Sequence, residues 1–156
     1  MKKLILVRHG TDEGGFNAHL SLTGKRQITD LAGKLAPHVD GNSVLMFSST
    51  ALRAQDGAKI LSKAISVSFE LCDTLWSGYD GKVLGCVPDF EQVMKLVSSH
   101  PNQADVVILI THYEYVEDFP QFFGKKYLGV DFPSKVIPKG TAWLVDCETK
   151  QVTHIC

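Results

Sequence analysis

The run Leu4-Ile5-Leu6-Val7-Arg8-His9-Gly10-Thr11, near the N-terminus, sets the architecture that we expect for the rest of the chain. Four consecutive apolar residues, two of them β-branched, are typical of a short strand that is buried on both faces. The apolar run stops at Arg8 and His9, so a cation and an imidazole stand at the carboxyl end of the strand, where open α/β sheets bind ligands. We expect Gly10 to let the backbone turn sharply and to leave space beside the imidazole.

The composition is that of an ordinary globular protein. The chain has 156 residues, with 16 Lys and Arg against 17 Asp and Glu, and 44% of its residues are hydrophobic. This length predicts a single domain over residues 1–156. The balanced charge argues against a nucleic-acid or membrane-surface partner. No apolar run reaches the ~18 residues of a membrane span, and the four apolar residues before Arg8 are too few for a signal peptide.

The cysteines do not form a recognisable metal or disulfide pattern. None of the four is in a C-x-x-C spacing, and all lie within or beside apolar segments: Cys72, Cys86, Cys147 and Cys156. We therefore expect reduced thiols, mostly packing, in a cytoplasmic protein.

Apolar periodicity predicts that strands and helices alternate along the chain. Helices are expected from Ser21, Ala51 to Lys63, Pro88 to Ser99 and Glu114 to Phe123. The first is ended by Pro37 and the Asp40-Gly41-Asn42 turn, and the last is broken or shortened by Pro120. Further strands are expected at 44–47, 65–71, 106–110, 141–145 and 152–155, the last two as an antiparallel pair, with loops at 72–87 and 124–140. This order predicts an α/β fold, a three-layer α/β/α sandwich with a mainly parallel sheet.

Three of the predicted buried strands end in polar residues. The first delivers Arg8 and His9, the second delivers Ser48-Ser49-Thr50 followed by Arg53, and the strand at 106–110 delivers Thr111-His112. Because the carboxyl ends of parallel strands meet at one edge of a sheet, these side chains can converge. Arginine forks match phosphate oxygens bidentately, so the pattern predicts a phosphoryl ligand.

The pair of imidazoles suggests how such a site could react. One imidazole can attack phosphorus and carry the group as a phosphohistidine, and the second, if protonated, can stabilise the charge of the transition state. This scheme needs no metal or other cofactor, and two arginines would repel a cation. A P-loop is also excluded, because Gly24-Lys25-Arg26 lacks the glycine spacing and the hydroxyl that holds magnesium.

With these motifs the sequence resembles the histidine phosphatases, the phosphoglycerate-mutase-like superfamily. The matching segments follow in the family's order: Arg8-His9-Gly10, Leu20-Ser21-x-x-Gly24-x-x-Gln27, Ser48-Ser49-x-x-x-Arg53-Ala54, Ile110-Thr111-His112 and Gly140-Thr141-Ala142-Trp143-Leu144. The resemblance implies that His9 is the catalytic nucleophile, and that Arg8, Arg53 and His112 bind phosphate and complete the catalytic site.

The sequence departs from the family pattern at the general acid. The family commonly places a Glu or Asp in a Leu-Arg-Glu-x-x-x-Gly-x-x-x-Gly segment, and here Ser77 occupies that position in residues 75–85. Serine cannot protonate a departing alkoxide at neutral pH. Asp73 and Asp80 are weak substitutes, because their offsets differ. The family's Gly-x-Thr-x-x-Asn continuation of the first motif is also missing, unless Asn17 reaches in from further along.

The missing acid decides the substrate that we expect. Small members of the superfamily that act on protein phosphohistidine also lack it, since an imidazole leaving group can depart protonated. We therefore expect a phosphatase that works through phospho-His9 on phosphohistidine in a protein. A small phosphorylated substrate, a phosphomonoester, is the alternative if an acidic side chain stands beside His9, whereas an open apolar mouth around Trp76 and Tyr79 would favour a protein. A third possibility is a phospho-ligand-binding module with weak turnover.

Overall fold

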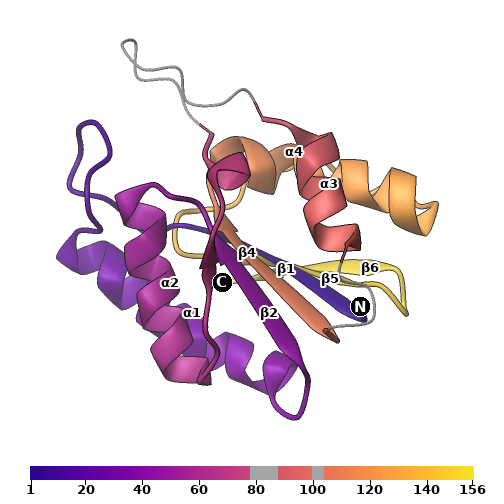
Figure 1. The fold of residues 1–156 in the computed structure, drawn as a ribbon, viewed down its shortest axis with the longest axis horizontal. Helices are drawn as coiled ribbons and strands as arrows, with labels where there is room; N and C mark the ends of the chain where they lie inside the picture. The colour runs from indigo at the N-terminus through magenta and orange to yellow at the C-terminus, as the bar shows by residue number, and fades with distance from the viewer. Residues whose placement is uncertain (78–87, 100–103) are drawn as a thin grey trace.

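A six-stranded sheet runs through the centre of the protein (Figure 1), in a computed structural model that describes residues 1–77, 88–99 and 104–156. The strand order is β3-β2-β4-β1-β5-β6. The parallel strands are β1 (Lys3–Arg8), β2 (Val44–Ser48), β3 (Glu70–Leu71) and β4 (Val106–Thr111). β5 (Ala142–Asp146) runs antiparallel to β1, and β6 (Gln151–Ile155) runs antiparallel to β5. The mainly parallel sheet and the antiparallel C-terminal pair are confirmed.

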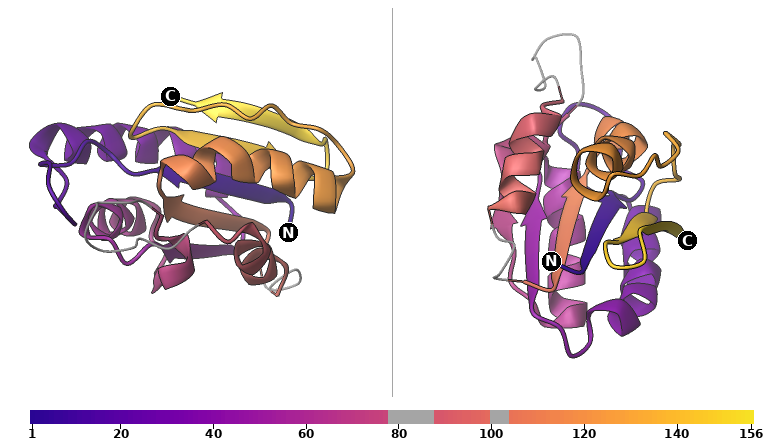
Figure 2. Two further views of the ribbon diagram at one scale, coloured as in Figure 1. Left: turned by 90° about the horizontal axis from the view of Figure 1, so that it is seen from above. Right: turned by 90° about the vertical axis from the view of Figure 1, so that its right-hand side faces the viewer.

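Helices cover both faces of this sheet (Figures 1 and 2), so the three-layer α/β/α sandwich is confirmed as well. Helices α1 (Leu22–Val39) and α2 (Leu52–Ile65) lie on one face, and α3 (Phe90–Ser98) and α4 (Tyr113–Phe123) lie on the other. A 3-10 turn, η1 (Asp73–Leu75), follows β3, and a π-type turn, η2 (Gly124–Leu128), extends α4.

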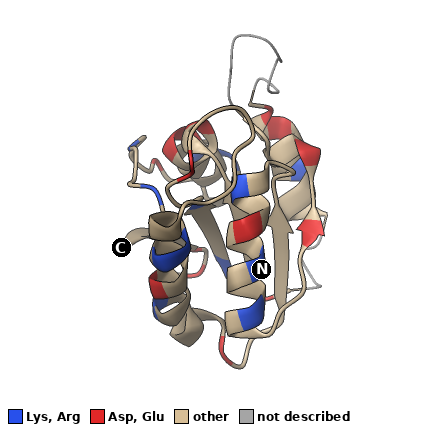
Figure 3. Cartoon of the chain, turned by 90° about the vertical axis from the view of Figure 1, so that its left-hand side faces the viewer, with Lys and Arg blue, Asp and Glu red and all other residues tan. Residues whose placement is uncertain are grey.

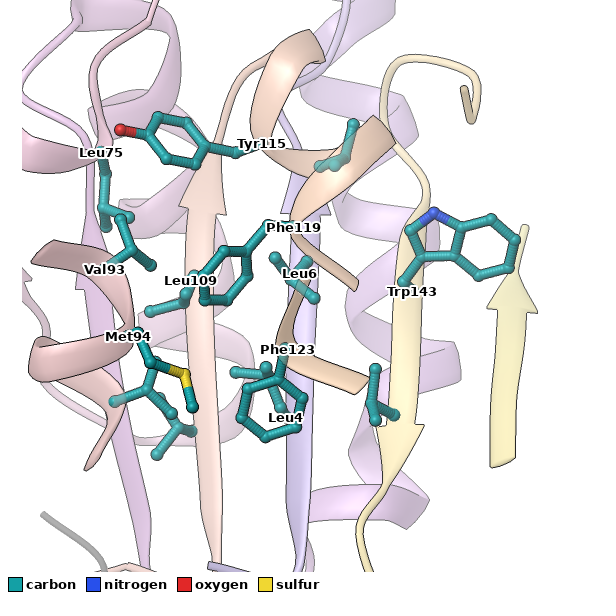
Figure 4. Packing of buried hydrophobic residues seen from close by; sticks show 14 of the residues in the cluster. Leu4, Leu6, Leu75, Val93, Met94, Leu109, Tyr115, Phe119, Phe123 and Trp143 are labelled. Carbon is teal, nitrogen blue, oxygen red and sulfur yellow. The ribbon is translucent and has the colours of Figure 1, made fainter. Parts of the chain in front are cut away.

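Strand β1 lies inside the sheet and divides its side chains between the two cores. Leu4 and Leu6 pack with the residues of α3 and α4, as Figure 4 shows, whereas Ile5 and Val7 pack with those of α1 and α2. All four side chains are fully buried. Burial of such a side chain stabilises the native state by about 1.5–3 kcal/mol. The short apolar run therefore anchors the sheet and fixes where Arg8 and His9 emerge.

Two prolines that we expected to end or break helices lie inside them. Pro37 is within α1, which continues to Val39 and ends at the expected Asp40-Gly41-Asn42 turn, and Pro120 is within an unbroken α4. A proline inside a helix costs about 3 kcal/mol, because it removes one hydrogen bond and crowds the preceding turn. In α4 the buried side chains Val116, Phe119 and Phe123 lie on both sides of Pro120, and their packing outweighs that cost.

Two other expectations about local structure were also wrong in part. The strand expected at 65–71 is limited to β3 at the edge of the sheet, because α2 continues to Ile65 and Ser66 then takes a left-handed conformation with φ 56°. The loop expected at 124–140 begins with the helical turn η2. The helix starts at Ser21 and near Pro88 are confirmed: Ser21 accepts a hydrogen bond from the Gly24 amide, and Asp89 accepts one from the Gln92 amide.

The surface and the cysteines are unremarkable in the described part of the chain. Basic and acidic residues alternate along the helices in the cartoon of Figure 3. Cys72, Cys147 and Cys156 are free thiols, as expected, while Cys86 lies outside the described residues. None of the described helices combines the length and the apolar character that a membrane crossing requires.

Candidate active site

The four predicted site residues come from the carboxyl ends of neighbouring strands and the start of one helix. Arg8 is the last residue of β1 and stands beside Thr111, the last residue of β4, in the parallel register. His9 and His112 directly follow these two strands, and Arg53 lies in the first turn of α2 after β2. The structure thus brings the predicted residues to one edge of the sheet.

His9 is held with one ring nitrogen toward the backbone and the other toward Arg53. Its Nδ1 lies 2.7 Å from the carbonyl oxygen of Gly10, and Arg53 Nε donates to its Nε2 at 3.1 Å. Since a carbonyl can only accept, Nδ1 carries the proton and Nε2 keeps its lone pair. Burial lowers the pKa of His9 to about 4, so the imidazole is neutral at pH 7. Nε2 is therefore the available nucleophilic atom.

His112 lies beside His9 and shares Arg53 with it. The two ring centroids are 5.1 Å apart in an edge-to-face arrangement. Arg53 Nη2 lies 3.3 Å from Nδ1 of His112, while Nε2 of the same ring lies 2.8 Å from Oγ of Ser49. Burial, followed by the charges of His9, Arg53 and Arg8, lowers the pKa of His112 well below its ordinary value. The second imidazole is thus neutral in the free protein and presents Nδ1 to the same spot as His9 Nε2.

Arg53 is positioned through the start of its helix. Leu52 directly precedes Arg53, and its amide donates a hydrogen bond to Oδ1 of Asn17 at 2.8 Å. Asn17 adopts φ 46°, a left-handed conformation that Asn tolerates better than most residues. Asn17 does reach in from further along the loop, and it does so as a partner of the α2 N-terminus.

Arg8 approaches the site from the α4 side. Its Nη1 donates to the Ile137 carbonyl oxygen at 2.7 Å, and its guanidinium carbon lies 5.2 Å from the Tyr113 ring centroid. Its buried Nε has no hydrogen-bond partner among the residues that the structure describes. No described hydrogen bond joins Arg8 to His9, Arg53 or His112 side chains, so Arg8 lies at the same edge with donor capacity still available.

Gly10 is required by close packing rather than by its backbone conformation. A Cβ atom on Gly10 would lie 2.5 Å from the Gly24 carbonyl oxygen, and one on Gly24 would lie 2.0 Å from that of Thr11. The backbone at Gly10 has no positive φ, so the close approach of Gly24 is what requires a glycine here. Oε1 of Gln27 also accepts from the amide and hydroxyl of Thr11. These contacts fasten α1 against the segment that carries His9.

A carboxylate from α4 lies beside Ser77. Ser77 is 1% exposed, and its Oγ donates to Oε2 of Glu114 at 2.5 Å. The sequence pattern does not indicate Glu114, because the family's acid belongs to the segment around Ser77. The available signal was the position of Glu114, two residues after His112 in the first turn of a helix that begins at the edge carrying the site.

The other carboxylates have different partners. Asp73 accepts a hydrogen bond from Thr50 Oγ1 at 2.7 Å and is exposed, and Asp80 lies outside the described residues. Asp12 pairs with Lys139 at 2.7 Å and lies 4.0 Å from Nδ1 of His9, on the side of the ring away from Nε2. Among the described residues, no group of three or more His, Cys, Asp or Glu side chains is arranged to hold a metal ion.

Comparison with known proteins agrees with this geometry. Residues 4–77, which include Arg8, His9 and Arg53, match the sequence profile of the histidine phosphatase superfamily (branch 1). No curated protein sequence matches the chain significantly.

Solved structures with the same fold cover nearly the whole chain. The protein histidine phosphatase SixA complexed with tungstate superposes with a TM-score of 0.69 at 16% identity, over 99% of this chain and 94% of its own. A mycobacterial glucosyl-3-phosphoglycerate phosphatase with VO3 gives 0.68 at 16% identity, over 99% and 97%. A SixA-type protein from Agrobacterium tumefaciens gives 0.70 at 16% identity, over 99% and 96%. At such identity the likeness shows the fold alone. The profile match adds sequence similarity to this superfamily over residues 4–77, slightly less than half of the chain.

Proposed function

We propose that this protein is a phosphatase that transfers the phosphoryl group of its substrate to Nε2 of His9 and then to water, without a metal ion. The observation that carries the proposal is the position of Arg53, whose guanidinium donates to His9 Nε2 and lies within hydrogen-bond distance of His112 Nδ1. One cation thus stands where the attacking atom and the second imidazole meet. A phosphoryl group bound there would take over these N–H donors with its oxygens.

The protonation state of His9 supports its role as the nucleophile. A neutral imidazole whose Nδ1 proton is held by the Gly10 carbonyl has its Nε2 lone pair ready to attack phosphorus. As the P–N bond forms, the ring becomes positively charged, and the Gly10 carbonyl stabilises that charge. His112 would donate to the phosphoryl oxygens once it takes up a proton, which the negative charge of the ligand favours.

The positive charge of the site comes from the protein itself. Arg8 and Arg53 provide two guanidinium groups, and the buried Nε of Arg8 has donor capacity for an incoming anion. Guanidinium groups match the oxygens of a phosphoryl group and can neutralise charge in the transition state. We propose on this basis that turnover requires no metal.

The preferred substrate expected from the sequence, phosphohistidine on a protein, also has a specific observation in its favour. Phe16 is 53% exposed and stacks on Trp76, directly before Ser77, with ring centroids 6.3 Å apart. The exposed ring of Phe16, supported by the half-buried Trp76, could contact the surface of a phosphorylated protein. The structural relatives include both a protein histidine phosphatase and a phosphatase named for a small phosphorylated sugar derivative, so both substrate classes are candidates.

A trapping experiment tests the covalent step. The protein is mixed with ³²P-labelled phosphoramidate, quenched in alkali, and examined for protein-bound label that is lost in acid, as expected for a phosphoramidate bond. We expect wild type to take up label and to release inorganic phosphate, and His9→Ala to do neither. His19→Ala is the matched control, because His19 is an exposed imidazole that pairs with Asp56.

The outcomes separate the candidate functions. Absence of label in wild type, or label that persists in His9→Ala, contradicts the covalent mechanism. A binding module would instead bind vanadate, lose that binding in Arg53→Ala, and release no phosphate from any donor.

A further inference from the structure

We propose that Glu114 is the general acid and base of this site, that the buried hydroxyl of Ser77 holds its carboxyl group in place, and that the enzyme is therefore built for phosphomonoesters with poor leaving groups. This proposal rests on the phosphatase function proposed above and names its substrate class. The family pattern places the general acid in the segment around Ser77. The proposal assigns this role to Glu114 in α4 instead.

The contact between Ser77 and Glu114 carries the proposal. Ser77 Oγ lies 2.5 Å from Glu114 Oε2, and Ser77 is almost completely buried. A serine at this position can use its single proton to orient one carboxyl oxygen, which leaves the other oxygen of Glu114 available for proton transfer. The two residues are 37 positions apart in the sequence, so the pairing is formed by the fold and not by local structure.

The charge of Glu114 acts on both arginines of the site. Glu114 lies in the first turn of α4, two residues after His112. Burial lowers the pKa values of both Arg8 and Arg53, and the negative charge of Glu114 acts against that shift in each case. Both guanidinium groups are proposed to bind the phosphoryl group. A carboxylate whose charge acts on both of them is therefore a candidate for proton transfer to a substrate bound between them.

Other described carboxylates near the site are less suited to this task. Asp12 is tied to Lys139 and faces Nδ1 of His9, whereas the leaving group must depart on the side of phosphorus opposite to Nε2. Asp73 is exposed and bound by Thr50. Glu117, three residues further along α4, interacts with Tyr113. Glu114 alone among these four has Ser77 as a partner.

The reaction balances with Glu114 in this role. In the first step the Nε2 lone pair of His9 forms a bond to phosphorus, the P–O bond to the alcohol breaks, and the departing oxygen takes the proton of Glu114. The products are phospho-His9, the free alcohol and the Glu114 carboxylate. In the second step this carboxylate takes a proton from water as the water oxygen attacks phosphorus, and the P–N electron pair returns to Nε2. Inorganic phosphate leaves and Glu114 is protonated again.

The need for an acid depends on the leaving group. A proton delivered to the departing oxygen matters for an alkyl ester, whose leaving group is poor. It matters little for a nitrophenolate or for a nitrogen leaving group that is already protonated.

The experiment compares three phosphoryl donors in wild type and Glu114→Gln: glycerol 2-phosphate, 4-nitrophenyl phosphate and phosphoramidate. We expect Glu114→Gln to lower kcat/KM by about 10²–10⁴-fold for glycerol 2-phosphate, and by less than about 10-fold for the other two donors. Glu117→Gln is the matched control, since it removes the same charge from the same helix near Arg8, and it should affect the three donors equally and weakly.

Ser77→Ala tests the positioning role separately. It leaves the carboxyl group present but without its partner, so we expect kcat for glycerol 2-phosphate to fall by about 10-fold with little change in KM, and 4-nitrophenyl phosphate to be nearly unaffected. A shifted pH–rate profile for glycerol 2-phosphate should accompany this loss. A merely structural role of Ser77 would slow all donors together.

The remaining outcomes are equally decisive. Equal losses with all three donors in Glu114→Gln would show that Glu114 acts on binding or folding, and would overturn the proposal. So would a wild type that hydrolyses phosphoramidate but not glycerol 2-phosphate. In both of these cases labelled phospho-His9 still forms, which distinguishes them from failure of the phosphatase function itself, where wild type forms no covalent intermediate with any donor.

Discussion

The proposed phosphate-binding side and the proposed proton-transfer side of this site are built in different ways. On the first side, His9 and His112 follow central parallel strands, and each ring is fixed by a hydrogen bond to Gly10 or Ser49 and by Arg53. On the second side, Ser77 follows a short 3-10 turn and Glu114 opens a helix. Recognition of a phosphoryl group requires several donors in fixed directions, and strand ends provide them. Proton transfer requires one carboxyl oxygen within reach, which different segments of the chain can supply.

The largest effect is expected from the phosphate-binding side. Arg53→Lys keeps the positive charge but cannot serve both imidazoles at once, because an ammonium group is a point donor rather than a planar fork. We expect kcat/KM to fall by about 10²–10³-fold, the usual consequence of losing one donor to the transition state. Steady-state kinetics with the three donors used for Glu114 would measure this.

The loss in Arg53→Lys should be the same for all leaving groups, in contrast to the selective loss in Glu114→Gln. Lys59→Ala is the control, because Lys59 is a largely exposed cation of the same helix that pairs with Asp56. A loss in Arg53→Lys that depends on the leaving group would contradict the division of the site into two sides.

The burial of His9 predicts a pH dependence of stability that belongs to the phosphate-binding side. Burial lowers its pKa from 6.5 to about 4. In the unfolded state the imidazole is therefore protonated below pH 6.5, whereas in the native state it is protonated only below about pH 4. The native state therefore loses stability as the pH falls through this window, by about 3 kcal/mol from His9. Urea unfolding of wild type and His9→Gln at pH 7 and pH 4 would test this.

The comparison between the two proteins isolates His9 from other groups that titrate in the same range. His9→Gln should lose about 3 kcal/mol less free energy of unfolding than wild type between these pH values. Equal losses in the two proteins would mean that His9 is accessible to protonation in the native state, and that its Nε2 is less protected than the structure indicates.

The smallest effect is expected at Asp73. Its carboxylate accepts a hydrogen bond from Thr50 and is exposed to solvent, so Asp73→Asn should change kcat/KM for glycerol 2-phosphate by less than about twofold and stability by about 0.5 kcal/mol or less. A loss comparable to that of Glu114→Gln would move the acid back to the segment in which the sequence pattern places it.

The parts of the structure that follow from periodicity could be predicted from the sequence. The apolar runs of β1, β2 and β4 identify a parallel sheet, and that topology alone requires Arg8, His9 and His112 to emerge at the same edge. Pro37 and Pro120 were misjudged because local rules favour helix ends there, while the packing of the whole helix decides the outcome. Propensity is a local quantity, and packing is not.

Glu114 could not be identified by the same reasoning. Its pairing with Ser77 depends on how closely the segment after η1 approaches the start of α4, and neither segment encodes that distance by itself. The same holds for Asn17 and Gly10. Their roles depend on contacts with the Leu52 amide and the Gly24 carbonyl, and these contacts follow from the three-dimensional arrangement of the loops.

The central place of β1 has a consequence for how the protein is made. Its neighbours in the sheet are strands synthesised much later, since Arg8 pairs with Thr111 and Val7 with Ala142. A nascent chain exposes His9, the proposed nucleophile, early, yet it cannot assemble the proposed anion pocket until β4 has left the ribosome. Such distant pairings slow folding, and an anion that binds only the completed pocket shifts the balance toward the native state. Phosphate, the product of the proposed reaction, would thus also serve as a ligand that favours completion of the fold.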